Sequence, residues 1–325
     1  MTNIKQIAKT AGVSISTVSR VLNNHPYVKE EKRKRVLDAV ENLNYAKNIN
    51  AIHLIKGKTY TIGVMLPFIN LPYFSTILEG IGDEALAAGY HINLCQTNYD
   101  SIEEIRVLEM MKMKQFDGMI ICSRTSSWEQ LEPFAKFAPI ISCEKMQHPL
   151  ISSVYVDHYE GFRLGTSYLL NEGHEKIGIC LARKTSVNSM EREKAFADVL
   201  RNAGKRVHPE WIFHQCYTMQ DGAQILHRIL NMENRPTAIF TANDQVAAGL
   251  LTEARKYGIR VPKDLAILGF DNHEISKTLE ISTIEHPGIT MGSRAFTLFH
   301  KQMQDEQITG NSEELPFHLI KRKTV

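Results

Sequence analysis

The spacing of apolar residues changes near residue 60. Before that point, apolar side chains recur every three or four positions in three short stretches, which predicts three amphipathic helices. Beyond it, short apolar runs alternate with helical stretches such as Phe74–Gly89, a pattern typical of parallel sheets covered by helices. The helical apolar positions are Ile4, Ile7, Ala8 and Ala11, then Val18, Val21 and Leu22, then Val36, Leu37, Val40 and Leu43.

The apolar runs beyond residue 60 are the candidate strands, and they exceed what one small sheet holds. They show no eightfold regularity that would favour a barrel, so the sequence predicts an α/β body of two doubly wound parallel-sheet lobes after a small all-α head. Ligands of such sheets bind beyond the carboxyl ends of the strands, so we expect a site in the cleft between the lobes. The runs cover residues 61–66, 91–95, 118–122, 139–142, 176–181, 237–241 and 265–270.

Turn signals in the head indicate a helix-turn-helix. Asn3 and Gln6 fit a capping box, Gly12 suits the end of the first helix, and Ser14 can cap the second. Two short helices joined by a glycine turn and braced by a third form this motif. The second helix leaves short hydroxyls and Arg20 outside, groups that suit phosphates and guanine edges in a major groove. The alternative is a helical hairpin that happens to be basic.

Charge is uneven along the chain, although the net charge is only +2. Residues 1–60 contain 11 lysines and arginines against 4 acidic residues, whereas the remainder contains 27 against 32. A basic head on an acidic body favours a polyanionic partner. The alternative is a solvated helix, because the basic run 29–35 also contains acids.

Several functional classes are disfavoured. The five cysteines are scattered without a C-x-x-C pair, and no metal site or cofactor is predicted. Neither a signal peptide nor an apolar run of about 20 residues occurs, so we expect a cytoplasmic protein. Without a G-x-S-x-G elbow, a Walker loop or H-E-x-x-H, we expect no enzyme. A solute-binding protein would need export, and a non-specific DNA binder would not need a cleft.

The segment IKQIAKTAGVSISTVSRVLNNHPYV, residues 4–28, resembles the head of the LacI/GalR family of bacterial transcription regulators. The family pattern runs unbroken from Ile4 to Asn23. The resemblance implies that Ile15, Ser16 and Arg20 face base edges. It places near phosphates or the groove edge the side chains of Asn3, Thr17, Ser19, Asn23 and Tyr27.

Residues 44–57 correspond to the hinge helix of that family, which folds on operator DNA. The resemblance implies that Leu54 wedges into the minor groove, where an inserted leucine kinks the duplex, with Ala51 as the small residue before it. This chain departs from the usual A-R-S-L at Ile52 and His53. The alternative is that Leu54 is an ordinary linker residue.

The body resembles the LacI/GalR core, which is related to periplasmic sugar-binding proteins, most specifically in TANDQVAAGLL and VPKDLAILGFDN. The implied organisation has three crossings between lobes, near residues 158, 288 and 316. The expected segments are a head at 1–45, a hinge at 46–58, an N-terminal lobe at 59–157 and 289–316, and a C-terminal lobe at 158–288 and 317–325.

The resemblance also implies a set of effector-binding residues. Polar partners beside aromatic faces suit a sugar, although a purine could stack on Tyr73 or Phe74 instead. Arg192, with Arg183 and Lys184 nearby, leaves room for a phosphate. The implied set is Tyr73, Phe74, Arg192, Tyr217, Asn243 and Asp271.

Other roles remain open for some residues in and near this set. Asp271 could cap a helix, Phe74 could be ordinary core, and Asp244 is expected to cap the helix that follows it. Trp128 and Trp211 are expected to be structural. The chain departs from the family at Glu144-Lys145, where Asp-Arg is frequent, and at Asp157-His158, where Asp-Asn is usual.

Together these features predict a homodimeric, effector-responsive repressor of a carbohydrate operon. Two heads would bind the halves of a near-palindromic operator. The family contains members that effectors release from DNA and members that effectors recruit to it. The alternatives are control by a purine or by a protein partner. The C-terminus has no heptad repeat, so we expect a dimer and not a tail-built tetramer.

Overall fold

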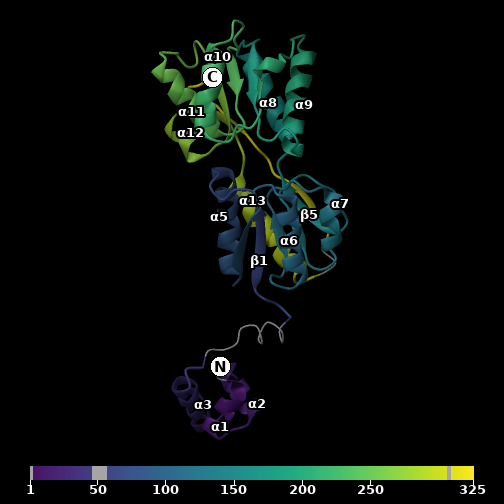
Figure 1. Ribbon diagram of the computed structural model, residues 1–325, viewed down its shortest axis with the longest axis vertical. Coiled ribbons are helices and arrows are strands. Elements are labelled where there is room, and N and C mark those ends of the chain that lie inside the picture. Colours follow the sequence, from purple (N-terminus) through teal and green to yellow (C-terminus); the bar gives the residue numbers. More distant parts are fainter. Residues whose placement is uncertain (1–2, 46–56, 306–308) are drawn as a thin grey trace. The chain divides into compact units, whose positions relative to one another are not determined.

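A computed structural model describes residues 3–45, 57–305 and 309–325. The chain divides into two compact units, Met1–Thr59 and Tyr60–Val325 (Figure 1). The predicted DNA contacts Ala51 and Leu54 lie outside the described residues.

The first unit contains α1 (Ile4–Ala11), α2 (Ile15–Leu22) and α3 (Glu30–Asn42). The predicted helix caps and the predicted glycine turn are confirmed. Asn3 and Gln6 exchange hydrogen bonds in a capping box, and the Ser14 side chain accepts from the amide of Thr17 at 3.2 Å. Gly12 has a φ of 61°, a left-handed conformation that glycine adopts without steric cost.

A small core holds the three helices together, and it differs from the prediction at one position. Leu37 was expected on the buried stripe of α3 but is 50% exposed, while Ala39 is buried instead. Successive helical residues are rotated by about 100°, so the face centred on Val36 and Ala39 leaves Leu37 outside. The buried residues are Ile7, Ala8, Ala11, Val18, Val21, Val36 and Ala39.

The second unit contains two six-stranded sheets, as the fold prediction requires. In the first sheet all strands are parallel, in the order β11-β5-β4-β3-β1-β2. These strands are β1 (Thr61–Leu66), β2 (His91–Gln96), β3 (Met119–Ile121), β4 (Ile140–Ser142), β5 (Ile151–Tyr155) and β11 (Ser312–Glu314).

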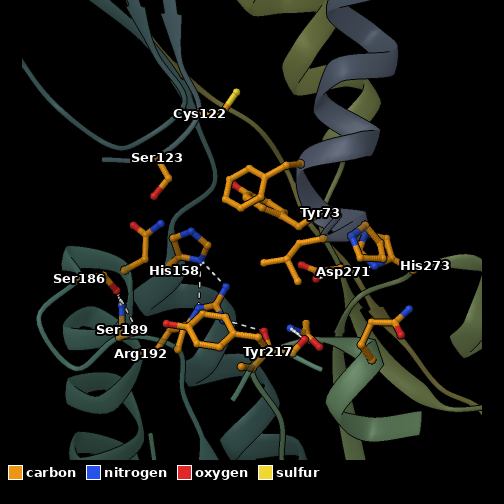
Figure 2. A pocket seen from close by; sticks show the side chains of 18 of the residues that line it. Tyr73, Cys122, Ser123, His158, Ser186, Ser189, Arg192, Tyr217, Asp271 and His273 are labelled. Atoms are coloured by element: carbon orange, nitrogen blue, oxygen red, sulfur yellow. Dashed lines mark hydrogen bonds and ion pairs between the residues drawn. The ribbon is translucent and has the colours of Figure 1, made fainter. Parts of the chain in front are cut away.

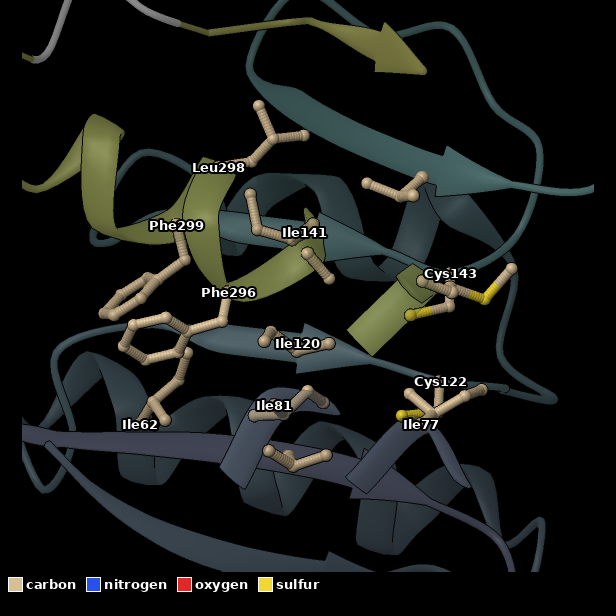
Figure 3. Close-up of a cluster of buried hydrophobic side chains, with 14 of the residues drawn as sticks. Ile62, Ile77, Ile81, Ile120, Cys122, Ile141, Cys143, Phe296, Leu298 and Phe299 are labelled. Atoms are coloured by element: carbon tan, nitrogen blue, oxygen red, sulfur yellow. The ribbon is translucent and has the colours of Figure 1, made fainter. Parts of the chain in front are cut away.

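Helices cover both faces of this sheet. Figure 3 shows the core beneath α5 (Pro72–Ala87) and α13 (Gly288–Gln302), where Phe296 and Phe299 pack over Ile62 and Ile120. The two helices approach closely, because a Cβ on Gly80 would lie 2.0 Å from the carbonyl oxygen of Ile289. The opposite face is covered by α6 (Ser101–Lys112), α7 (Trp128–Leu131) and the 3-10 turn Glu132–Phe134.

The second sheet has the order β12-β10-β9-β8-β6-β7 and is parallel except for β12, which pairs antiparallel with β10. Its helices α10 and α11 cover one face, and α8 and α9 the other. The strands are β6 (Ile177–Cys180), β7 (Ile212–Phe213), β8 (Ala238–Phe240), β9 (Ala266–Asp271), β10 (Ser282–Glu285) and β12 (Leu319–Ile320). The helices are α8 (His158–Asn171), α9 (Val187–Asn202), α10 (Met219–Leu230), α11 (Asp244–Lys256), α12 (Glu274–Thr278) and the 3-10 turn Pro209–Trp211.

The chain passes between the two sheets after β5, after β10 and after β11. We call the first sheet with α5, α6, α7 and α13 lobe 1, and the second sheet with α8 to α12 lobe 2. Each lobe therefore contains strands from separate parts of the sequence. Among the described residues, no helix has the length and apolar character needed to cross a membrane.

Candidate functional site

A cavity of about 110 Å³ lies between the carboxyl ends of strands from the two lobes (Figure 2). All six side chains that sequence analysis assigned to effector binding line it. Two lie on α5, one on α9 and one in the loop before α10, while the others follow β8 or end β9. They are Tyr73, Phe74, Arg192, Tyr217, Asn243 and Asp271.

The guanidinium of Arg192 is fixed by three contacts. Its Nη1 donates to the carbonyl of Ala242 at 2.8 Å, and its Nε and Nη2 lie 3.3 and 3.1 Å from Nδ1 of His158. It also stacks 4.2 Å from the centre of the Phe270 ring. Burial lowers the pKa of Arg192, while the charge of Asp271 raises it. The contacts leave guanidinium N–H groups available to a ligand in the cavity.

His158, the first residue of α8, is the position where the family usually has asparagine. Burial, then the charges of Arg192 and His286, hold the pKa of His158 well below its ordinary value. A neutral ring that accepts at Nδ1 carries its proton on Nε2. Here the departure noted in the sequence has a structural role, because the imidazole orients the arginine.

Asp271 ends β9 with a φ of 104°, a conformation that side-chain-bearing residues rarely adopt. The residue is 6% exposed, and burial followed by the charge of Asp244 raises the pKa of its carboxyl group well above the usual range. Strained, buried acids of this kind concentrate at functional sites. Asp271 does not cap the next helix, since α12 begins after His273.

Asn243, and not Asp244, caps α11. The Asn243 side chain accepts from the amide of Val246 at 2.9 Å and donates to the carbonyl of Tyr217 at 3.1 Å. The predicted cap, Asp244, is the first helical residue and is fully buried, accepting from the amide of His273 and the hydroxyl of Thr283 at 2.7 Å each. Asn243 thus shapes the cavity wall by holding Tyr217.

Aromatic rings supply the apolar part of the cavity. Tyr73 meets Phe74 edge-to-face at 4.9 Å, and burial raises the pKa of Tyr73 well above its ordinary value. Phe74 belongs to the lobe 1 core and also lines the cavity. Burial raises the pKa of Tyr217 to about 12.

Several polar residues of the cavity were not predicted from the sequence. Ser186 caps α9, accepting from the amide of Ser189 at 3.1 Å, and both serines face the cavity. Most of the missed residues follow the carboxyl end of a strand or begin a helix, and this placement could have identified them. They include Tyr99, Ser123, His158, Ser186, Asn188, Ser189, Gln245 and His273.

At Glu144-Lys145, where the family frequently has Asp-Arg, the arginine that pairs with the acid comes from the loop after the neighbouring strand β3. Arg124 lies 3.3 Å from the carboxylate of Glu144 and stacks 4.2 Å from the Trp128 ring, which explains the structural role of that tryptophan. Lys145 instead pairs with Asp157 at 2.6 Å. Trp211 is buried in lobe 2, also as expected of a structural residue.

The head presents the predicted polar face on α2. Ile15 is 45% exposed, Ser16 and Arg20 are exposed, and Thr17 and Ser19 are half-buried. Asn3, Asn23 and Tyr27 are also exposed. The hydroxyls of Ser16 and Thr17 each lie 2.9 Å from that of Ser14.

Two other arginines of the head brace its turns. Arg35 donates to the carbonyl of Gly12 at 3.2 Å, and Arg33 donates to that of His25 at 2.7 Å. Arg20 makes no such contact with the described residues, so its guanidinium remains available. The residues that the structure describes contain no cluster of three or more histidines, cysteines or acids arranged for a metal.

Known protein families match parts of both compact units of the chain. Residues 3–48 match the family described as bacterial regulatory proteins, lacI family, and residues 166–325 match a periplasmic binding protein-like domain. The chain is 45% identical over 325 residues to the uncharacterized HTH-type transcriptional regulator YkvZ of Bacillus subtilis (strain 168), covering all of both chains.

Two further matches span nearly the whole length. The NTD biosynthesis operon regulator NtdR of the same organism is 38% identical, with full coverage of both chains. The lac repressor dimer bound to operator and the anti-inducer ONPF has a TM-score of 0.84 at 25% identity, covering 99% of this chain and 98% of that one.

Proposed function

This chain belongs to the lacI family of bacterial regulatory proteins and is a sequence-specific DNA-binding transcription regulator, and from that premise we propose that it is a repressor controlled by a sugar or sugar derivative. The repressor would act on a carbohydrate-utilisation operon in the cytoplasm, where it meets the chromosome. The effector would bind in the cavity between the lobes. One observation carries the proposal: six residues from distant parts of the sequence line the same cavity.

The chemistry of the cavity favours a polyhydroxylated ligand. Arg192 offers donors, Asp271 offers a buried carboxyl group, and Ser186 and Ser189 offer hydroxyls. Tyr73 and Phe74 provide ring faces and edges against which C–H surfaces can pack. Polar groups around an apolar wall match the alternating hydroxyls and C–H faces of a sugar.

The head would bind one half-site of a near-palindromic operator, with a second copy on the other half. The solved lac repressor is a dimer on operator, which supports a homodimer here. Base-edge contacts would come from Ile15, Ser16 and Arg20, and the hinge would add Ala51 and Leu54. Contacts near the phosphates would come from Asn3, Thr17, Ser19, Asn23 and Tyr27. Phosphate contacts make binding weaken steeply with salt.

Effector binding would change the angle between the lobes and thereby favour or disfavour the DNA-bound state. A coupling free energy of about 1–3 kcal/mol would change operator affinity roughly 5- to 150-fold. Such coupling requires only that the effector bind one arrangement of the lobes more tightly than the other.

A thermal-shift panel tests the effector class. The purified protein is screened against mono-, di- and oligosaccharides, sugar phosphates and purines, because a ligand that binds only the folded state raises its melting temperature. We expect a shift with a sugar, lost in Asp271→Ala. A shift with a purine alone would indicate a transcription regulator whose effector is a purine and not a sugar. Silence across the panel would contradict control by these ligands and favour a protein partner.

A further inference from the structure

Arg183 reaches from lobe 2 to lobe 1. It lies in the loop between β6 and α9, and its Nη1 donates to the hydroxyl of Thr125 at 2.8 Å while its Nη2 donates to the carbonyl of Arg124 at 2.7 Å. Both acceptors belong to the loop between β3 and α7. The same guanidinium lies 3.6 Å from the centre of the Tyr99 ring, also in lobe 1. One side chain therefore makes three contacts with the other lobe.

The receiving loop is already fixed within lobe 1. Glu104 on α6 is fully buried, and its carboxylate accepts from the amides of Thr125 and Ser126 at 2.7 Å each. Arg124 is held by Glu144, Trp128 and the carbonyl of Ser126. The two acceptors for Arg183 are thus positioned before the lobes meet, so closure orders few additional groups.

The contacts of Arg183 adjoin the cavity. Tyr99 lines the cavity, and its hydroxyl lies 3.3 Å from that of Ser123, another lining residue. On the lobe 2 side, the Ser186 hydroxyl donates to the carbonyl of Arg183 at 3.1 Å and also faces the cavity. A second contact between lobes lies nearby, where Phe68 meets Tyr217 edge-to-face at 6.3 Å.

We propose that Arg183 is an interlobe clamp that holds the cleft closed without an effector. A clamp that favours the closed arrangement reduces the free energy of closure that effector binding would otherwise have to supply. Thr125, Arg124 and Tyr99 engage the guanidinium of Arg183, which the sequence had left open for a phosphate. The clamp concerns the two lobes alone and stands whether or not the cavity binds a sugar.

Thiol labelling tests the clamp without any effector. Cys122 lines the cavity and is 1% exposed, whereas Cys180 is buried in lobe 2 away from the cavity. The full-length protein is treated with N-ethylmaleimide, and mass spectrometry measures labelling at each cysteine. Loss of two hydrogen bonds and a cation–π contact shifts a closed–open equilibrium by roughly tenfold or more. We therefore expect Arg183→Ala to speed labelling of Cys122 by about tenfold and leave Cys180 unchanged.

Matched variants separate the clamp from a general loss of structure. Lys184→Ala removes an exposed neighbouring charge and should leave both labelling rates as they are in the wild type. An unchanged Cys122 rate in Arg183→Ala would overturn the clamp. If Cys122 and Cys180 both became faster, Thr125→Val would decide, since it removes one acceptor and no charge. Faster labelling of Cys122 alone in that variant supports the clamp, and any other result overturns it.

Discussion

Nδ1 of His158 lies 3.1 Å from Nη2 and 3.3 Å from Nε of Arg192, so a neutral imidazole orients the buried guanidinium of the cavity. The two residues come from α8 and α9, which pack side by side in lobe 2. The acceptor at position 158 therefore supplies two of the contacts that hold Arg192 in this orientation.

Replacing His158 with leucine should therefore destabilise the protein and weaken effector binding. The substitution leaves two guanidinium donors without an acceptor, which costs about 1–3 kcal/mol of unfolding free energy. His158→Asn retains an amide oxygen as acceptor and is the matched control. Urea unfolding of both variants measures the difference. Equal stability of the two would show that the acceptor is unimportant.

His286 should make stability depend on pH. Burial holds its pKa at about 3, whereas an exposed histidine titrates near 6.5, so below about pH 6.5 the unfolded chain takes up a proton that the folded chain does not. Acid therefore favours unfolding. Relative to His286→Gln, the wild type should lose about 2 kcal/mol of stability between pH 7 and pH 5. Chemical denaturation at both pH values measures this difference, and parallel behaviour of the two proteins would contradict the prediction.

Breaking the buried pair of Arg124 and Glu144 should be costly. Glu144→Gln leaves Arg124, with a side chain only 10% exposed, without its carboxylate, and loss of one partner of such a pair costs about 3–5 kcal/mol. The double variant Arg124→Met with Glu144→Gln should recover much of that loss. Lys145→Ala removes a lysine whose side chain is 58% exposed, and losing its pair with Asp157 should cost less than about 1 kcal/mol. Additive losses in the double variant would argue against direct coupling.

The Asp271→Asn variant should keep its folding stability but lose its response to the effector. Asparagine has the same shape and tolerates positive φ, and it removes a carboxyl group whose charge is costly to bury. We expect unchanged or higher stability and retained operator binding, with the effector-induced thermal shift lost. Thermal unfolding with the sugar found in the panel, and DNA titration, measure both properties. A normal shift would show that Asp271 does not bind the effector.

Arg20→Ala should abolish operator selectivity while the cavity still binds its effector. A bidentate arginine–guanine contact contributes about 1–3 kcal/mol of discrimination, whereas phosphate contacts carry affinity without sequence information. Titrations of operator and scrambled DNA at one salt concentration measure the ratio. Lys34→Ala, on α3, is the control and should lower both affinities little. An unchanged ratio in Arg20→Ala would remove this arginine from base recognition.

Features that depend on neighbouring residues could be predicted from the sequence. Apolar spacing located the helices of the head, and the side chains of Asn3 and Ser14 fixed where two of them begin. The long apolar strands β1 and β9 were found within a residue of their observed ends. Their signal is local because both faces of a central parallel strand are buried.

Features that depend on distant partners were missed. β5 contains two serines and β11 consists of one serine and two glutamates, so neither has a strong apolar signal, and each is a strand because of the strands beside it. Asp244 was expected to cap α11, but its carboxylate accepts from the distant Thr283 and His273 instead, and Asn243 is the cap. The pairing of Arg124 with Glu144 depends on β3 lying beside β4, which is a property of sheet order.

The interleaved path of the chain bears on its synthesis. Lobe 1 receives α13 and β11 from residues beyond 287, after almost all of lobe 2 has been translated. Without α13, the side chains of Ile62, Ile77 and Ile120 would be exposed to water. Lobe 1 therefore leaves the ribosome first but is completed only after most of lobe 2 has been synthesised. A chain truncated before α13 should need a chaperone or aggregate.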